Sequence, residues 1–125
     1  NKLFGTTIII SENTLSNIEN LIDYNYRFLA KVQVKGQEGI VSIYEFFDGD
    51  IKENIDVKVQ SQADFDKGLN AYFQKDFLSA AGHLKKVLEI NPNDTTAERY
   101  LKNAAQFIVS GVPSDWTGIE RMTSK

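Results

Sequence analysis

One lysine, Lys35, has the position in this sequence best suited to binding a ligand, because it stands at the tip of a predicted hairpin. The segment Val32-Gln33-Val34-Lys35-Gly36 ends an alternating strand with an ammonium group beside a glycine. An ammonium group on a flexible stem can stabilise negative charge on a bound molecule. Taken alone, however, the segment indicates only a strand and a turn, in which Lys35 would be a solvated surface residue.

The other residues that could bind a metal or move a proton lack partners at the required spacing. His83 is the one histidine of the chain, and metal or acid-base sites need further ligands, so a packing or surface role is favoured. A cluster of acidic residues lies near the middle of the chain, at Asp48, Asp50, Glu53 and Asp56. It lacks the Asp-x-Asp-x-Asp-Gly order and the closing Glu of a calcium loop. We therefore predict no metal site here and expect this segment to be a solvated linker.

Composition and charge narrow the class of protein. The chain has 125 residues, a formal net charge of -3 and no cysteine, which excludes disulfides and thiolate metal sites. Acidic and basic residues are interspersed, so we expect no nucleic acid partner. No apolar run approaches the roughly 20 residues that span a bilayer, so no membrane contact is expected from this segment.

Two observations bear on where the protein acts. The lack of cysteine fits a reducing, cytoplasmic location. The sequence starts at Asn1 without a methionine and without a signal-peptide layout, so we expect a segment of a longer protein. Whether that longer protein carries a membrane anchor stays open.

The first half of the sequence predicts a β-α-β-β arrangement. A β-branched run over 6–10 indicates a buried strand, and Ser11 is suited to cap a short helix with Leu15, Ile18 and Ile22 on its apolar face. From Tyr26 to Val34, apolar residues alternate with Arg27, Lys31 and Gln33, as in a half-buried strand. Glycines in 36–39 then return the chain into an antiparallel strand over 40–44.

The second half changes to helical periodicity after a charged segment, 48–60, that we interpret as a linker. Three helices are predicted from their start signals. Ser61 with Asp64 is a candidate cap for the first, and Asp76 for the second. Thr95 and Glu98 have the spacing of a capping box for the third.

The helical half has the spacing of one tetratricopeptide repeat, whose period is about 34 residues. The matching residues are Gly68, Ala71, Tyr72, Asp76, Phe77, Ala80, Leu84, Val87, Leu88 and Pro92. The small residues Gly68 and Ala80 are expected to let two helices approach closely, and Pro92 to end the second of them. A lone repeat leaves its outer face uncovered, so we expect the first half, the tail or another chain to cover it.

Two stretches of the sequence also resemble, in the same order, the C-terminal part of bacterial class III nucleotidyl cyclases. The first is the hairpin, in which Val34-Lys35-Gly36 precedes Ile43-Tyr44-Glu45-Phe46. The second is the helical half and its ending. Its matching residues are Gly68, Ala71, Tyr72, Asp76, Phe77, Ala80, Val87, Leu88, Pro92, Asp94, Tyr100, Leu101, Pro113, Asp115, Trp116, Gly118 and Lys125.

This resemblance implies an α+β chain in three parts. Residues 1–47 would be a β-α-β-β fragment of a ferredoxin-like cyclase catalytic domain. Residues 48–60 would be the linker, and residues 61–125 a three-helix, tetratricopeptide-like tail.

The resemblance also implies an activity for a longer parent protein. Such cyclases are phosphorus-oxygen lyases of signal transduction that convert ATP or GTP to the cyclic 3',5'-monophosphate and pyrophosphate. The nucleotide lies between two catalytic domains, so a homodimer is implied, with Mg or Mn held by two aspartates. The hairpin lysine of these enzymes reaches the nucleotide phosphates, and Lys35 matches it.

The remaining catalytic residues of the family lie upstream of this segment. Without the two metal ions, attack on the phosphate loses its main source of charge stabilisation, so this chain alone is expected to be inactive. Two positions also depart from the family. Gln37 stands where a second lysine is common and Ala30 where glycine is common, which implies weaker phosphate binding.

A rival hypothesis makes the helical half a binding module for a peptide, a regulatory domain or a second copy of the chain. Its candidate partner-binding residues are Tyr72 and Trp116, because exposed aromatic side chains concentrate binding energy. We favour the alternative that Trp116 folds back over the helices and covers their apolar face. A third hypothesis is a scaffold derived from a catalytically inactive cyclase homologue.

Overall fold

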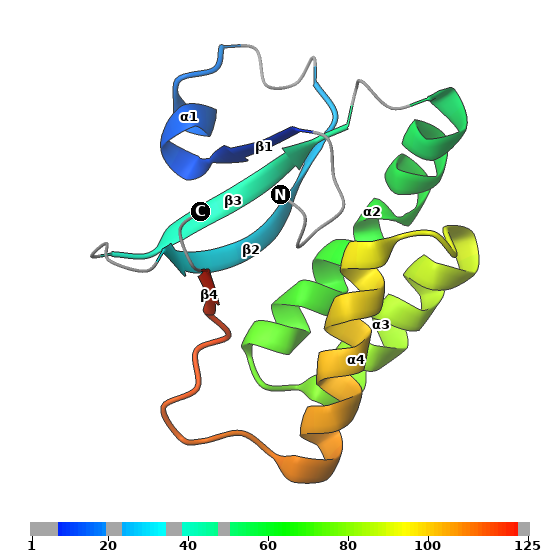
Figure 1. The fold of residues 1–125 in the computed structure, drawn as a ribbon. Coiled ribbons are helices and arrows are strands. Elements are labelled where there is room, and N and C mark those ends of the chain that lie inside the picture. Colours follow the sequence, from blue (N-terminus) through cyan, green and yellow to red (C-terminus); the bar gives the residue numbers. More distant parts are fainter. Residues whose placement is uncertain (1–7, 20–23, 35–38, 48–50, 123–125) are drawn as a thin grey trace. The chain divides into compact units, whose positions relative to one another are not determined.

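The computed structural model describes residues 8–19, 24–34, 39–47 and 51–122 (Figure 1). The chain forms two compact units. We call residues 1–51 with 118–125 the sheet unit, and residues 52–117 the helical unit. An α+β chain with an antiparallel hairpin followed by helices was predicted, and the structure confirms this class.

The sheet unit contains four strands in the order β1-β3-β2-β4. They are β1 (Ile8–Ser11), β2 (Tyr26–Val34), β3 (Val41–Phe46) and β4 (Glu120–Met122), and a short helix α1 (Glu12–Ser16) follows β1. Both β1 and β2 run antiparallel to β3, which lies between them. The β1-α1-β2 connection is therefore a split β-α-β unit.

The predicted elements of this unit are present, with a shorter helix than expected. Helix α1 ends at Ser16, whose hydroxyl donates to the Asn13 carbonyl oxygen at 2.9 Å. Ile18 lies beyond the helix in a turn in which its N–H donates to the Leu15 carbonyl oxygen at 3.1 Å. Ile22, the third predicted residue of the apolar face, lies outside the described residues.

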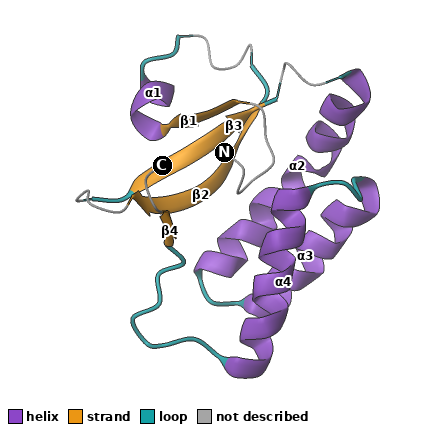
Figure 2. Cartoon of the chain, in the orientation of Figure 1, coloured by secondary structure: helices purple, strands orange, loops and turns teal. Residues whose placement is uncertain are grey.

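The helical unit contains α2 (Lys52–Phe73), α3 (Phe77–Ile90) and α4 (Thr95–Ser110), seen in purple in Figure 2. The cap predicted for the second helix is confirmed, because the Asp76 carboxylate accepts the N–H of Ser79 at 3.3 Å. The second helix also ends where Pro92 indicated, with Asn91 as its C-cap.

Three predictions for the helical half are wrong. The supposed linker is helical from Lys52 onward, and its charges support the helix, as in the Lys52–Asp56 pair one turn apart at 3.3 Å. Ser61 is not a cap: it lies inside α2, where its hydroxyl donates to the Val57 carbonyl oxygen at 2.7 Å. The third helix is capped by Asp94, not by Thr95.

The expected close packing of small residues is present between α2 and α3. Gly68 is buried, and a Cβ atom at this position would lie 3.1 Å from the Leu84 side chain, closer than ordinary contact. Ala80 and Leu84 are fully buried on the facing helix. Residue size at Gly68 and Ala80 therefore allows the two helices to approach closely.

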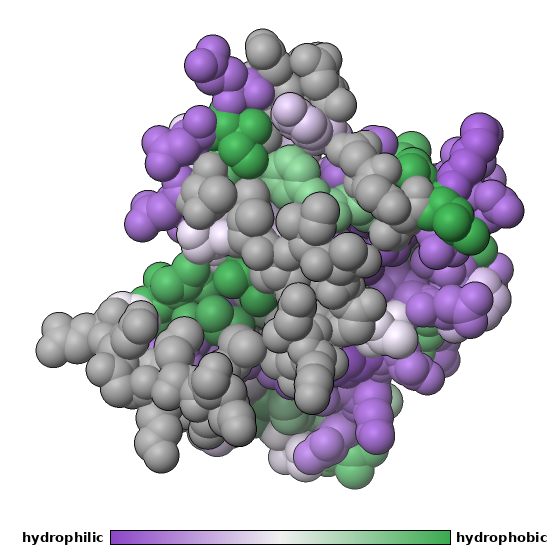
Figure 3. Space-filling view, turned by 45° about the horizontal axis from the view of Figure 1, so that its top comes forward, coloured by the Kyte–Doolittle hydropathy of each residue, from purple (hydrophilic) through white to green (hydrophobic). Residues whose placement is uncertain are grey.

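On the face seen in Figure 3, hydrophobic side chains of the described residues reach the surface in separate groups among hydrophilic ones. The large hydrophobic residues that are exposed are Tyr24, Ile40, Ile51, Val59, Leu78, Ile108 and Val109. Among the described helices, none has the length and apolar character needed to cross a membrane.

Candidate functional site

The candidate site is the β2–β3 hairpin, whose connection contains Lys35. The two strands pair antiparallel, with Val32 opposite Val41 near that connection. Lys35 and Gln37 lie outside the described residues, and the chain is described again from Gly39. Gly39 has a φ of +90°, a conformation that glycine adopts without strain, as expected for a turn residue.

A strand from the C-terminal tail lies beside the strand that leads to Lys35, and the sequence did not predict it. β4 pairs in parallel with β2, placing Glu120 opposite Val32 and Met122 opposite Val34 (Figure 1). A three-residue strand is too short to show an alternating pattern, so its sequence carried no signal. The last residues of β2 thus have β3 on one side and β4 on the other.

β2 does not keep the strict alternation that the sequence predicted, because its register shifts between Phe28 and Ala30. The extra residue, Leu29, makes a bulge and is fully buried. The register then places Arg27 on the same face as Ala30 and Val32, rather than on a solvated face. All three residues are at most 3% exposed.

A buried ion pair joins the two hairpin strands on this face. The Arg27 Nε atom donates to the Glu45 carboxylate at 2.8 Å, and the side chains are 2% and 1% exposed. The residues are also register partners, so the pair fixes the alignment of β2 on β3 at the end far from Lys35. The sequence did not indicate this pair, since buried and solvated arginines look the same in an alternating pattern.

Aromatic rings cover the opposite face of the hairpin. The rings of Tyr26 and Phe46 stack with centroids 5.3 Å apart, and Phe28 meets Tyr44 edge to face at 5.7 Å. Burial, and then the charges of the nearby Glu12 carboxylate and Tyr26 phenol, raise the pKa of the Tyr44 hydroxyl above its usual value. The shift favours the neutral hydroxyl, and the ring of Tyr44 packs against Phe28.

In the helical unit, Trp116 folds back as favoured in the sequence analysis. Its ring centroid lies 5.3 Å from Phe77, 5.4 Å from Tyr72 and 5.7 Å from Phe107. Tyr72 lies at the centre of this cluster, in contact with Phe73, Phe77, Tyr100, Phe107 and Trp116. Tyr72 is only 4% exposed, so the structure makes it a core residue rather than a contact for a partner.

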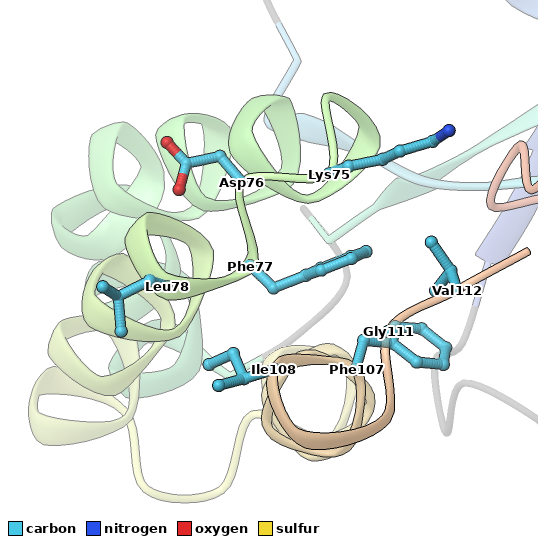
Figure 4. Close-up of a pocket in the computed structure, with 8 residues that line it drawn as sticks. All are labelled: Lys75, Asp76, Phe77, Leu78, Phe107, Ile108, Gly111 and Val112. Atoms are coloured by element: carbon cyan, nitrogen blue, oxygen red, sulfur yellow. The ribbon is translucent and has the colours of Figure 1, made fainter. Parts of the chain in front are cut away.

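A shallow groove of about 420 Å³ lies beside this cluster, between the start of α3 and the end of α4 (Figure 4). Phe77 and Phe107 line it, with ring centroids 5.1 Å apart. The exposed side chains of Leu78 and Ile108 line it, and Lys75 lies at its margin. The groove is thus mainly apolar, with charge at one end.

His83 has a carboxylate partner that the sequence did not indicate, because the partner lies on a different helix. Its Nδ1 atom lies 3.1 Å from the Asp64 carboxylate of α2, and both side chains are about three-tenths exposed. The pair links α2 to α3 beside Gly68. Within the described ranges, no group of three or more His, Cys, Asp or Glu side chains is arranged to hold a metal ion.

Comparison with known proteins gives one relative. The chain is 28% identical over 108 residues to the adenylate cyclase named terminal-differentiation specific from Dictyostelium discoideum. The matched region is 86% of this chain but 5% of the length of that protein. No protein-family model and no solved structure matches the chain.

This similarity supports a relation between the chain and adenylate cyclases. At 86% of the chain, the match includes parts of both the sheet unit and the helical unit. The sequence resemblance noted above, found in the hairpin and in the helical half, agrees with it.

Proposed function

We propose that this chain is the C-terminal segment of a class III nucleotidyl cyclase, a longer protein that makes cyclic AMP or cyclic GMP and pyrophosphate from ATP or GTP. The observation that carries the proposal is the similarity to an adenylate cyclase over 108 residues. The split β-α-β unit with its hairpin supports it, because the resemblance expects this arrangement at the end of the catalytic domain. The helices would form the tetratricopeptide-like tail.

In this proposal Lys35 contacts the nucleotide phosphates. It follows the last residue of β2, whose alignment is fixed by β3, β4 and the buried Arg27–Glu45 pair. Rigid strands on both sides of a connection limit where its side chains can reach. The ammonium group would stabilise the negative charge that develops on the leaving pyrophosphate.

The metal ions expected of the parent, Mg or Mn, do not fit the residues described here. The described residues contain no group of carboxylates and imidazoles suited to a metal, and we assign no step to a metal in this segment. We propose that the longer protein supplies the metal ligands, that it acts as a homodimer in the cytoplasm, and that the segment by itself is inactive.

Replacing Lys35 in the longer parent tests its role. We expect Lys35→Ala to lower kcat/KM for the nucleotide by about ten- to a hundred-fold, since one charge-stabilising group is lost. Lys35→Arg should retain part of the activity, because it keeps the charge. The measurement is the initial rate of cyclic nucleotide formation.

The matched control is Lys86→Ala, which removes an exposed lysine from α3 and should leave the rate unchanged. Unchanged kinetics in Lys35→Ala would remove this lysine from the site. A parent that carries its metal aspartates and still makes no cyclic nucleotide would favour the scaffold hypothesis over the enzyme.

A second candidate function is self-association through the helical unit, and the apolar groove favours it. Residues 103–114 contain no charged side chain. Ile108 and Val109 in this segment are 47% and 89% exposed, and Leu78 of α3 is 75% exposed. Uncharged apolar surface is typical of the centre of an interface. Lys75 and Asp76, of opposite charge, also line the groove. A second copy of the chain, with the same mainly apolar surface, would suit this face.

Sedimentation of the 125-residue chain over a range of concentrations tests this function. We expect a dimer, and Leu78→Glu should weaken it by about tenfold or more by burying a charge at the contact. Val59→Glu is the control, because Val59 is also exposed and hydrophobic but does not line the groove. A monomer at every concentration, or a dimer indifferent to Leu78→Glu, would exclude this interface.

A further inference from the structure

Three aromatic rings from three different helices meet at Trp116 within the helical unit. They are Tyr72 of α2, Phe77 of α3 and Phe107 of α4, and their centroids lie 5.4, 5.3 and 5.7 Å from that of the indole. The rings are inclined to the indole by 72°, 76° and 70°, the edge-to-face geometry that aromatic pairs prefer. We call these three rings the indole socket, because together they fit one flat aromatic side chain.

The indole socket is also held together by contacts that do not involve Trp116. The ring of Tyr72 packs edge to face on Tyr100, with centroids 4.9 Å apart, and lies 5.6 Å from Phe77. Phe77 in turn lies 5.1 Å from Phe107. Because these rings stand on three packed helices, we expect the socket to persist when Trp116 leaves it.

The segment that carries Trp116 is held less firmly than the helices. Residues 113–115 are exposed, and the Trp116 N–H donates within the segment, to the Pro113 carbonyl oxygen at 3.0 Å. Within the described ranges, the hydrogen bond found between these residues and the helices runs from Lys75 Nζ to the Ser114 carbonyl oxygen, at 3.4 Å. A segment with few buried contacts opens at a low cost in free energy. The ring, rather than the backbone, therefore provides most of the attachment.

Lys75 has a backbone conformation that points to a role for its side chain. Among the described residues other than glycine, it alone has a positive φ, +68°, which strains a residue with a side chain. Its ammonium group donates to the carbonyl of Ser114, two residues before Trp116. It also lies at the margin of the groove that Phe77 and Phe107 line (Figure 4). Lysine thus supplies a donor for a backbone carbonyl beside the socket, which glycine would not.

We propose that the indole socket and Lys75 form a binding site for a short, tryptophan-bearing segment of another protein, and that Trp116 occupies this site as a tethered competitor. The chain's own segment shows which chemistry fits. A flat aromatic side chain enters the socket, and a carbonyl two residues earlier accepts from the ammonium group.

The site lies wholly within the helical unit, so it does not depend on the sheet unit or on cyclase activity. It is also distinct from the self-association proposed above, which uses the exposed groove rather than the socket. A ligand in the socket would reach the groove as well, where Val112 now lies beside Phe107.

A peptide with the sequence of residues 111–117, added to the Trp116→Ala form of the 125-residue chain, tests the site. The peptide then carries the only tryptophan in the mixture, so a shift of its emission to shorter wavelength measures binding. We expect it to bind, and the same peptide with alanine at position 116 to bind at least about tenfold more weakly, because one aromatic side chain carries most of the contact. A folded Trp116→Ala chain that binds neither peptide, or both equally, would overturn the proposal.

Competition in the unsubstituted chain does not depend on the folding of Trp116→Ala. This chain should bind the peptide at least about tenfold more weakly than Trp116→Ala does, because its site is already filled through a short tether. A peptide with phenylalanine at position 116 measures the displacement directly. Trp116 is the one tryptophan of the chain, so its release should shift the emission to longer wavelength as this peptide is added. Emission that stays constant over the whole range of peptide concentration would overturn the tethered competitor.

Lys75→Gly, measured in the Trp116→Ala chain, separates a binding role of the lysine from a structural one. Stability should be kept, because relief of the strained φ offsets the larger entropy of glycine in the unfolded chain. Loss of the ammonium donor should weaken peptide binding by about threefold or more. The control is Lys86→Ala, which removes an exposed lysine from α3 and should change neither quantity. Unchanged peptide binding in Lys75→Gly would overturn the assignment of Lys75 to the site.

Discussion

Arg27→Met is expected to destabilise the sheet unit by about 3–5 kcal/mol, because it removes the buried guanidinium that pairs with the buried Glu45 carboxylate. Both side chains of the pair are at most 2% exposed, and Nε and the carboxylate oxygen are 2.8 Å apart. Native-state hydrogen exchange at β2 and β3 amides is the suitable measurement, since it reports the opening of the sheet unit separately from the helical unit.

The double variant Arg27→Met with Glu45→Leu separates the contribution of the two charges to stability from the contribution of side-chain packing. Replacing both charges by apolar side chains of similar volume should recover most of the lost stability, because neither charge is then buried. The exposed Lys52–Asp56 pair, at 3.3 Å with side chains 85% and 61% exposed, is the control. Lys52→Ala should cost about 0.5 kcal/mol or less. A small effect of Arg27→Met alone would show that Glu45 has other adequate partners.

Tyr72→Ala is expected to destabilise the helical unit by about 3–5 kcal/mol, the usual cost of removing a large buried aromatic side chain. Its ring contacts five other aromatic rings and is 4% exposed. The loss would leave a cavity between α2, α4 and the tail, and Trp116 would lose one of its ring contacts. Urea unfolding followed by Trp116 fluorescence measures the change.

Tyr72→Phe is the matched variant, because it keeps the ring and removes only the hydroxyl. That hydroxyl accepts a hydrogen bond from the Asn103 side chain at 3.4 Å, so the expected cost is about 1 kcal/mol or less. Equal, small effects of both substitutions would contradict the packing role of Tyr72. Normal stability with lost self-association would instead support the partner-binding role predicted from the sequence.

The elements that the sequence predicted well are those specified by residues close together in the chain. The hairpin strands follow from alternation and from the glycines between them, as Gly39 with its positive φ illustrates. The start of α3 follows from Asp76, which accepts a backbone N–H three residues later. Each of these signals acts over a few residues, so the sequence displays it directly.

The wrong predictions of helix starts also relied on local signals. Ser61 and Asp64 have the residue types and spacing of a helix cap. The charged residues before them are also helical, however, so Ser61 lies inside α2 and its hydroxyl donates to the Val57 carbonyl oxygen. Thr95 with Glu98 has the spacing of a capping box, but the adjacent Asp94 caps the helix. Neighbouring residues that could each cap a helix differ little in energy, and the pattern of residue types does not show which of them does so.

By itself, the sequence determined the order and type of most elements, the close approach of two helices at Gly68 and the candidate lysine in the hairpin. Only the tertiary structure decided that Arg27 is buried with Glu45, that Trp116 packs on Tyr72, and that β4 lies beside β2. These contacts join residues far apart in the chain. Their energy comes from burial and from pairing with a specific distant partner, and a local pattern of residue types does not encode which partner that is.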